Sequence, residues 1–182
     1  MNARSNTVDE IETHAGPSDF ETLFYAHHER IARVINRVIR DEGRAEEISV
    51  EVFWKFWRTP RAHGEKAGGW LYRAAVRLSL NELRRHLRAV RNEGLSTVEQ
   101  HAPDPEQVRA ATEEQEHVRT ILAALPERQA ELLLLRSSGL SYEELASALE
   151  LNPASIGTLI SRAQQAFRKE YIKRYGEQTN GR

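Results

Sequence analysis

The chain has 182 residues, of which 40% are hydrophobic and 29% charged, and its formal net charge at pH 7 is -1. These proportions are typical of a globular protein and exclude a largely disordered chain. The absence of cysteine excludes disulfides, thiolate metal sites and thiol nucleophiles. Because no apolar run is long enough to span a bilayer or to form a signal core, we expect a cytoplasmic protein that makes no membrane contact.

The N-terminal half is predicted to be helical. Apolar residues recur at helical spacing over residues 20–39 and, after a break near Gly43, over residues 45–58. The stretch "TPRAHGEKAGG" ends the second segment because it contains glycine and proline, and a third helical pattern runs over residues 70–91. Since no strand alternation is convincing, residues 18–91 are predicted to form one all-helical domain.

The helical pattern fades over residues 92–112, which contain two prolines and a glycine. This composition predicts a flexible linker. Helical patterns then resume and predict a second, compact four-helix domain over residues 113–174. Residues 1–17 and 175–182 are expected to be tails. The predicted fold class is therefore all-α, with two small helical domains joined by a flexible linker.

The stretch "LSYEELASALELNPASIGTLISRA" contains two short helical patterns that meet at a sharp corner. Ser141 and Glu144 have the spacing of a capping box. Asn152 is a good N-cap and Pro153 a good first helical residue, so the second helix begins at once. This spacing is typical of a helix-turn-helix, whose second helix enters the major groove of DNA. Glu150 stands where the turn usually has glycine, which predicts some backbone strain.

The outer face of the second helix is polar. Its hydroxyl, amide and guanidinium groups are able to bind phosphates and base edges. The residues on this face are Ser155, Thr158, Ser161, Arg162 and Gln165. A plain helical hairpin with a polar outside would show the same residues, but the agreement of turn, caps and outer face favours DNA binding.

Charge is unevenly distributed along the near-neutral chain. Between Arg73 and Arg91 the sequence has six arginines and only one acidic residue, Glu82. A local cluster of this kind favours contact with a polyanion over a basic coat on the whole protein. A solvated helix face is the alternative interpretation.

Three motifs together resemble bacterial RNA polymerase sigma factors of the extracytoplasmic-function (ECF) type. They are "AEEISVEVFWKFWR" from Ala45, "GWLYRAAVRLSLNELRR" from Gly69 and "ALPERQAELLLLRSSGLSYEELASALELNPASIGTLISRA" from Ala124. The resemblance implies that residues 18–91 are sigma region two and residues 113–174 sigma region four. It also implies a protein that binds core RNA polymerase, recognises promoter DNA and promotes its melting. Such a protein is not an enzyme and needs no metal or cofactor.

The resemblance implies that the helix Ala45–Arg58 docks on the clamp helices of the largest polymerase subunit. The residues expected to make this contact lie outside the apolar stripe and are Glu46, Glu47, Glu51 and Trp54. Large aromatic residues often anchor protein interfaces. The alternative is a solvated acidic face with both tryptophans of this helix in the core. For Trp57 we expect the core position.

The resemblance also implies that the loop 63–69 and the helix after it open and read the minus-ten promoter element. Melting needs groups that hold the DNA backbone and accept an extruded base. The residues expected to serve this purpose are Lys66, Trp70, Arg73, Arg77, Asn81, Arg84 and Arg88. For Trp70 a core position is favoured over stacking on DNA. The helix from Pro153 would read the minus-thirty-five element as duplex, and an anti-sigma factor is a further possible partner.

The sequence departs from the family pattern at several positions. Arg77 stands where the family often has asparagine, Val50 where it often has glutamine, and Ala130 where it often has arginine. Gly157 and Leu159 occupy positions of the recognition helix that are usually basic. Fewer cations predict fewer phosphate contacts and a weaker dependence of binding on salt.

Two other functions fit part of the sequence. A stand-alone helix-turn-helix regulator would explain the second domain but not the first, and the near-neutral charge argues against strong autonomous DNA binding. A sigma-like protein that binds a partner without reading promoters would explain the weakly basic recognition helix. An enzyme is not supported, because His27 and His28 lack metal-ligand spacing and no phosphate loop or serine elbow is present.

Overall fold

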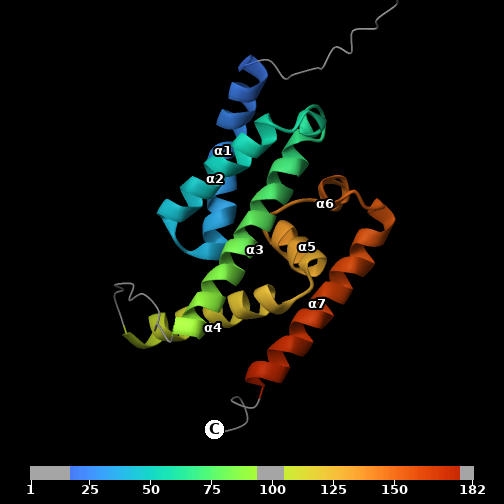
Figure 1. Ribbon diagram of the computed structural model, residues 1–182. Helices are drawn as coiled ribbons and strands as arrows, with labels where there is room; N and C mark the ends of the chain where they lie inside the picture. The colour runs from blue at the N-terminus through green and yellow to red at the C-terminus, as the bar shows by residue number, and fades with distance from the viewer. Residues whose placement is uncertain (1–16, 94–104, 177–182) are drawn as a thin grey trace, which may run out of the picture.

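The computed structural model of the protein describes residues 17–93 and 105–176. Over these residues it consists of seven α-helices and one short 3-10 helix and contains no strand (Figure 1). The predicted all-α fold class is thereby confirmed. Most of the two predicted tails and the middle of the predicted linker lie outside the described residues. Residue 17, predicted as tail, begins the first helix, residue 175 ends the last one, and residues 92–93, predicted as linker, are helical.

The N-terminal domain consists of α1 (Pro17–Ile39), α2 (Glu42–Trp57) and α3 (Ala67–Glu93), with the short helix η1 (Pro60–Ala62) between α2 and α3. The three long helices contact one another pairwise. The predicted apolar stripes form their buried faces, because helical periodicity puts residues three and four apart on one side. On α2 the buried residues include Phe53 and Phe56, which are 2% and 0% exposed.

The turn between α1 and α2 lies at Arg40 and Asp41, not at Gly43. Arg40 has a φ of 59°, in the left-handed region, and reverses the chain. The Asp41 side chain then accepts a hydrogen bond of 2.9 Å from the backbone N–H of Arg44, which caps the new helix. Gly43 therefore lies in the first turn of α2, where the cap compensates for the weak helix propensity of glycine.

The C-terminal domain consists of α4 (Pro105–Ala124), α5 (Glu127–Ser137), α6 (Tyr142–Leu149) and α7 (Pro153–Tyr175). Helix α4 begins at Pro105, inside the range predicted as linker. Proline is tolerated in the first turn of a helix because its missing N–H would be unpaired there anyway. The end of the predicted linker is thus helical.

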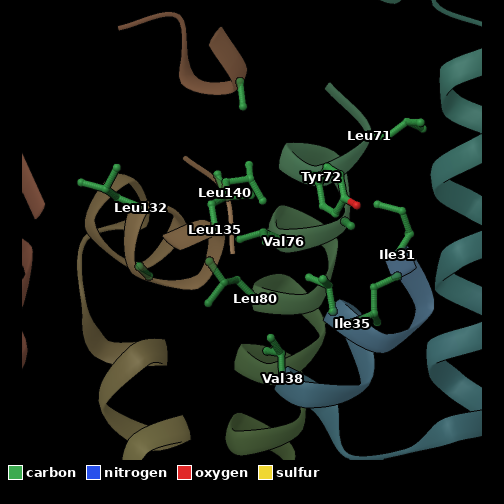
Figure 2. Close-up of a cluster of buried hydrophobic side chains, with 14 of the residues drawn as sticks. Ile31, Ile35, Val38, Leu71, Tyr72, Val76, Leu80, Leu132, Leu135 and Leu140 are labelled. Atoms are coloured by element: carbon green, nitrogen blue, oxygen red, sulfur yellow. The ribbon is translucent and has the colours of Figure 1, made fainter. Parts of the chain in front are cut away.

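The two domains pack against each other and share one hydrophobic core. Helix α3 contacts α1 and α2 on one side and α4, α5 and α6 on the other, so it lies at the centre of the molecule (Figure 1). Figure 2 shows Val76 of α3 beside Leu135 and Leu140, while Ile31 and Ile35 of α1 lie across α3. All five side chains are at most 2% exposed. The side chains of α3 therefore hold both domains together.

An ion-pair network joins the start of α2 to α3. The Arg44 guanidinium donates to Glu82 on α3 at 3.3 Å and to Glu47 at 2.6 Å. Arg85 also donates to Glu82. Burial alone would raise the pKa of the Glu82 carboxyl, but the hydrogen bonds from Arg44 and Arg85 outweigh it and lower this pKa below its usual value of 4.5. The carboxylate form is thus favoured in the folded state.

We predict that Glu82→Gln lowers the free energy of unfolding by about 1–3 kcal/mol at pH 7, the range for charge-assisted hydrogen bonds. Because the folded-state pKa is the lower one, this contribution is complete above about pH 4.5 and is lost as the pH falls through the folded-state value. Urea unfolding between pH 7 and pH 4 measures the difference in the free energy of unfolding between the variant and the wild type. The exposed Glu143→Gln variant is the control. A difference in the free energy of unfolding that grows as the pH falls would contradict the prediction.

Candidate functional site

The outer face of α2 carries the residues expected to bind the polymerase. Glu46, Glu47 and Trp54 are exposed, and Glu51 is half-buried. The Trp54 side chain is 59% exposed, which is unusual for a large aromatic residue. Val50 lies on the same helix with 56% exposure, although sequence reasoning did not include it in the site.

Each acidic residue of this face has a basic neighbour. Glu47 pairs with Arg44 as described above, and Glu51 lies 2.9 Å from Lys55. Glu46 lies 3.4 Å from the imidazole Nε2 of His28 on α1. Solvent-exposed ion pairs contribute only about 0–1 kcal/mol each, so the carboxylates can exchange these neighbours for basic groups of a partner at little cost.

The expected core position of Trp57 is wrong. Trp57 is 38% exposed, and its ring packs at an angle against Phe20 of α1, with ring centroids 5.1 Å apart. It lies in the last turn of α2, directly after the fully buried Phe56. Neighbouring helical residues point about 100° apart, so burial of Phe56 turns Trp57 towards the surface.

The loop before α3 places Lys66 and Trp70 in different surroundings. Lys66 is exposed, whereas Trp70 is half-buried and packs against the core, its ring centroid 5.7 Å from that of Phe56. This agrees with the favoured core position of Trp70. The His63 ring nitrogen Nε2 lies 3.1 Å from the carbonyl oxygen of Phe56, which holds the loop against the end of α2.

The residues of α3 expected to bind the minus-ten element divide into two groups. Asn81 and Arg88 are exposed. Arg77 is also exposed, whereas Arg73 and Arg84 are half-buried, and the side chains of all three bind the C-terminal domain. Arg77 donates to Glu131 on α5 at 2.5 Å and to Glu127 at 3.2 Å. In the sequence these arginines form one continuous basic stripe, and nothing in it distinguishes the ones that bind the C-terminal domain from the others.

A cationic groove of about 630 Å³ lies where the end of α3 meets α4 and α7. Its guanidinium groups come from Arg84, Arg88 and Arg91 of α3 and from Arg174 of α7, and Asn81 adds an amide. Sequence reasoning missed Arg174, because the contact joins two segments far apart in the chain. The groove extends the basic face of α3 across both domains.

The helix-turn-helix corner is formed by α6 and α7. The Ser141 hydroxyl accepts from the backbone N–H of Glu144 at 3.2 Å, and the Glu144 carboxylate accepts from the N–H of Ser141 at 2.6 Å, so the capping box is confirmed. The Asn152 side chain accepts from the N–H of Ala154 at 2.9 Å and caps α7. Glu150 has a φ of 54° and a ψ of 48°, the left-handed conformation that glycine prefers.

The outer face of α7 exposes Thr158, Ser161, Arg162 and Gln165. Ser155 is half-buried, and its hydroxyl donates to the backbone carbonyl of the N-cap at 2.7 Å. Arg162 has neither an ion pair nor a hydrogen bond within the described part of the chain. These exposed groups are therefore available to a ligand.

The two unusual residues of α7 have different surroundings. Leu159 is half-buried and packs against the core, so an apolar side chain fits this position better than the basic one typical of the family. A Cβ atom on Gly157 would lie 3.6 Å from the ring of Tyr142 on α6, an ordinary van der Waals distance. No steric reason for glycine is evident at that position.

The described residues were compared with two further kinds of site, a metal centre and a membrane-spanning helix. Within 17–93 and 105–176, no three histidine, aspartate or glutamate side chains gather where they could hold a metal ion. The helices of these segments are also too short or too polar for any of them to cross a membrane.

Comparison with known protein families gives two matches that follow one another along the chain. Residues 23–89 match the family Sigma-70 region 2, and residues 115–166 match Sigma-70, region 4. The first match falls within α1–α3 and the second within α4–α7. Together they cover both structural domains.

Individual relatives match over most of the chain. The chain is 28% identical over 171 residues to the ECF RNA polymerase sigma factor SigE of Mycolicibacterium smegmatis, a match that covers 91% of this chain and 66% of the relative. It is 27% identical to the RNA polymerase sigma-H factor of Pseudomonas aeruginosa, covering 82% of this chain and 84% of that protein.

Solved structures show the same fold. The sigma factor RpoE in complex with the anti-sigma factor NepR from Bartonella quintana matches with a TM-score of 0.50 and 20% identity, covering 86% of this chain and 98% of that one. CnrH in complex with the cytosolic domain of CnrY matches with a TM-score of 0.51 and 19% identity, covering 88% and 92%.

The left-handed conformation at Glu150 leads to a stability prediction. A non-glycine residue in the left-handed region lowers the stability of the fold by about 1–2 kcal/mol. Glycine avoids this cost but loses more conformational entropy on folding, which is a smaller penalty. Glu150→Gly should therefore raise the free energy of unfolding by about 0.5–1 kcal/mol. Ser147→Gly, at an exposed position inside α6, is the matched control and should lower it. Thermal or urea unfolding compares both variants, and destabilisation by Glu150→Gly would contradict the strain.

Proposed function

Because the chain belongs to the extracytoplasmic-function type of RNA polymerase sigma factors, which direct the polymerase to promoters, we propose that its surfaces divide the steps of initiation. Residues 18–91 act as region two and residues 113–174 as region four. The family is non-enzymatic, so RNA synthesis belongs to the polymerase. The protein works in the cytoplasm with core polymerase and promoter DNA as its partners.

The outer face of α2 binds the clamp helices of the largest polymerase subunit. The observation that carries this proposal is the 59% exposure of Trp54 among Glu46, Glu47 and Glu51. An exposed tryptophan buries a large apolar area when a partner covers it, and such residues often dominate binding. The surrounding carboxylates supply charge complementarity to basic groups, which sets orientation and speeds association.

The basic face of α3 and the outer face of α7 contact the promoter. Lys66, Asn81 and Arg88 are exposed and can bind the backbone of the melted minus-ten strand, where loss of stacking must be compensated. Thr158, Ser161, Arg162 and Gln165 face outward on α7 and contact the minus-thirty-five duplex, with Ser155 at the helix start. Because Trp70 is packed against Phe56, it supports the loop and does not stack on a base.

An anti-sigma factor is a further proposed partner. Two solved structures with this fold are complexes, and in one of them the partner is the anti-sigma factor NepR. At 19–20% sequence identity, these two structures share the fold with this chain. We therefore infer the class of partner only, a protein that holds the sigma factor away from the polymerase.

The polymerase contact is tested with Glu47→Lys combined with Glu51→Lys. Charge reversal puts cations opposite basic groups, and like charges across an interface are strongly unfavourable. We expect co-elution with core polymerase on size-exclusion chromatography to be lost. The control is the equally charged double variant Glu113→Lys and Glu143→Lys in the C-terminal domain, which should co-elute normally. Normal yield of complex with the α2 variant would rule out this surface.

The promoter contact is tested with Arg162→Ala. Loss of one guanidinium contact to phosphate or base should lower promoter-dependent transcription by about tenfold, since such contacts contribute about 1–3 kcal/mol. Polymerase binding should be unchanged. Arg168→Ala, at an exposed position further along α7, is the matched control. If Arg162→Ala reduced polymerase binding as much as transcription, the assigned role would be wrong, and full activity would point to a protein that does not read the minus-thirty-five element.

A further inference from the structure

A small cavity of about 240 Å³ lies where α5, α6 and α7 meet α3. Pockets for drug-sized ligands measure roughly 300–1,000 Å³, so this one suits a small metabolite. Its apolar wall comes from α5, α6, the turn and α7 and consists of Leu132, Leu149, Leu151 and Leu159. We call it the helix-turn-helix cavity.

Two buried polar atoms on residues of this cavity have no hydrogen-bond partner among the described residues. They are the guanidinium Nε of Arg73 on α3 and the amide oxygen Oε1 of Gln129 on α5. Another nitrogen of Arg73 donates to the carbonyl of Ala148 at 3.4 Å, so its Nε is the donor that is left over. Buried polar groups in proteins are nearly always paired. The two atoms therefore indicate a bound group that offers an acceptor to Arg73 and a donor to Gln129.

The charges around the cavity indicate what these groups are. Two further guanidinium groups belong to Arg128 of α5 and Arg162 of α7, which are exposed and form no ion pair within residues 17–93 and 105–176. Guanidinium groups bind carboxylates with strong, often bidentate hydrogen bonds. Among the described residues, Glu131 is the one acidic side chain that lines the cavity. Its carboxylate, together with the amide oxygen of Gln129, provides acceptors for an ammonium group.

We propose that the helix-turn-helix cavity binds a free α-amino acid with an apolar side chain. The arginines bind its carboxylate, with Arg73 as the buried donor. The ammonium group donates to Gln129 and lies near the carboxylate of Glu131, while the side chain packs against the four leucines. Water alone would pair the two polar atoms but would gain nothing from the leucine wall, whereas an apolar side chain is favoured there.

Binding of the amino acid affects Arg162, which also belongs to the outer face of α7. This second step rests on the proposed function of that face in binding the minus-thirty-five duplex. A guanidinium that binds the carboxylate of the ligand cannot bind a DNA phosphate or base edge at the same time. The amino acid therefore acts as an effector that lowers promoter reading, and by reciprocity promoter DNA weakens its binding.

The first test titrates the full-length protein with L-leucine by isothermal titration calorimetry. Three related probes each lack one part of leucine: glycine lacks the apolar side chain, 4-methylpentanoate the ammonium group and 3-methylbutylamine the carboxylate. L-Leucine should bind one to one, and each of the three probes about tenfold more weakly or worse. Equal affinities for all four compounds would overturn the proposal. So would the absence of both binding and a rise in melting temperature with L-leucine and L-phenylalanine, because the cavity would then hold water alone.

Two variants locate the binding groups. Gln129→Leu keeps the size of the side chain but removes the acceptor for the ammonium group. It should weaken L-leucine binding about tenfold and leave binding of 4-methylpentanoate, which has no ammonium group, unchanged. Arg73→Met removes the guanidinium and should weaken both L-leucine and 4-methylpentanoate but not 3-methylbutylamine. Merely structural damage to the cavity would weaken all of these probes together.

The matched control is Gln115→Leu. It makes the same substitution at an exposed position of α4 that does not line the cavity, and it should bind L-leucine like the wild type. Melting curves without ligand verify that all variants are folded. If Gln115→Leu lost as much affinity as Gln129→Leu, the binding site would lie elsewhere. If Gln129→Leu weakened L-leucine and 4-methylpentanoate equally, the assigned ammonium contact would be wrong.

The second test measures transcription with core polymerase at a promoter mapped with the wild-type protein. Saturating L-leucine, compared with the same concentration of glycine, should lower initiation by about tenfold, as expected for loss of the Arg162 contact. The Gln129→Leu protein should not respond. Unchanged initiation despite calorimetric binding would overturn the link to promoter reading. Failure to bind core polymerase with or without L-leucine would reject the proposed function, whereas calorimetry decides the amino-acid site independently.

Discussion

The central constraint on this protein is that one helix, α3, packs against the other helices of its own domain and against the C-terminal domain. One side carries Val76 and Leu80 into a core that includes Leu135 of the other domain, and the same side ends in arginines that bind carboxylates and carbonyls. A helix buried on two sides keeps only a narrow exposed strip. The exposure of the remaining polar residues of α3 therefore depends on whether the two domains are in contact.

The sequence predicted the elements that follow from local chemistry. The helical stripes of α2 and α3, the capping box at Ser141 and the N-cap at Asn152 are all present, because each depends on residues a few positions apart. The break near Gly43 was misplaced, since the reversal uses Arg40 in a left-handed conformation that arginine seldom adopts. The same preference for glycine correctly drew attention to Glu150, which adopts the left-handed conformation.

The candidate surfaces were predictable only where exposure follows from the helical stripe. The outward position of Trp54 and Arg162 follows directly from the buried faces of α2 and α7. The partners of Arg77 could not be predicted, because Glu131 lies 54 residues away and its burial arises from the packing of two domains. One signal was present: Glu131 directly precedes four leucines, a position where an acidic residue without a cation would be costly.

The ion pair between Arg77 and Glu131 joins one exposed partner to one buried partner. The Arg77 side chain is 46% exposed, whereas the Glu131 side chain is 1% exposed. Because a buried carboxylate without a cation is strongly unfavourable, the packing of α5 on α3 depends on Arg77. The guanidinium itself stays partly in contact with water, so its own desolvation cost is smaller than that of Glu131.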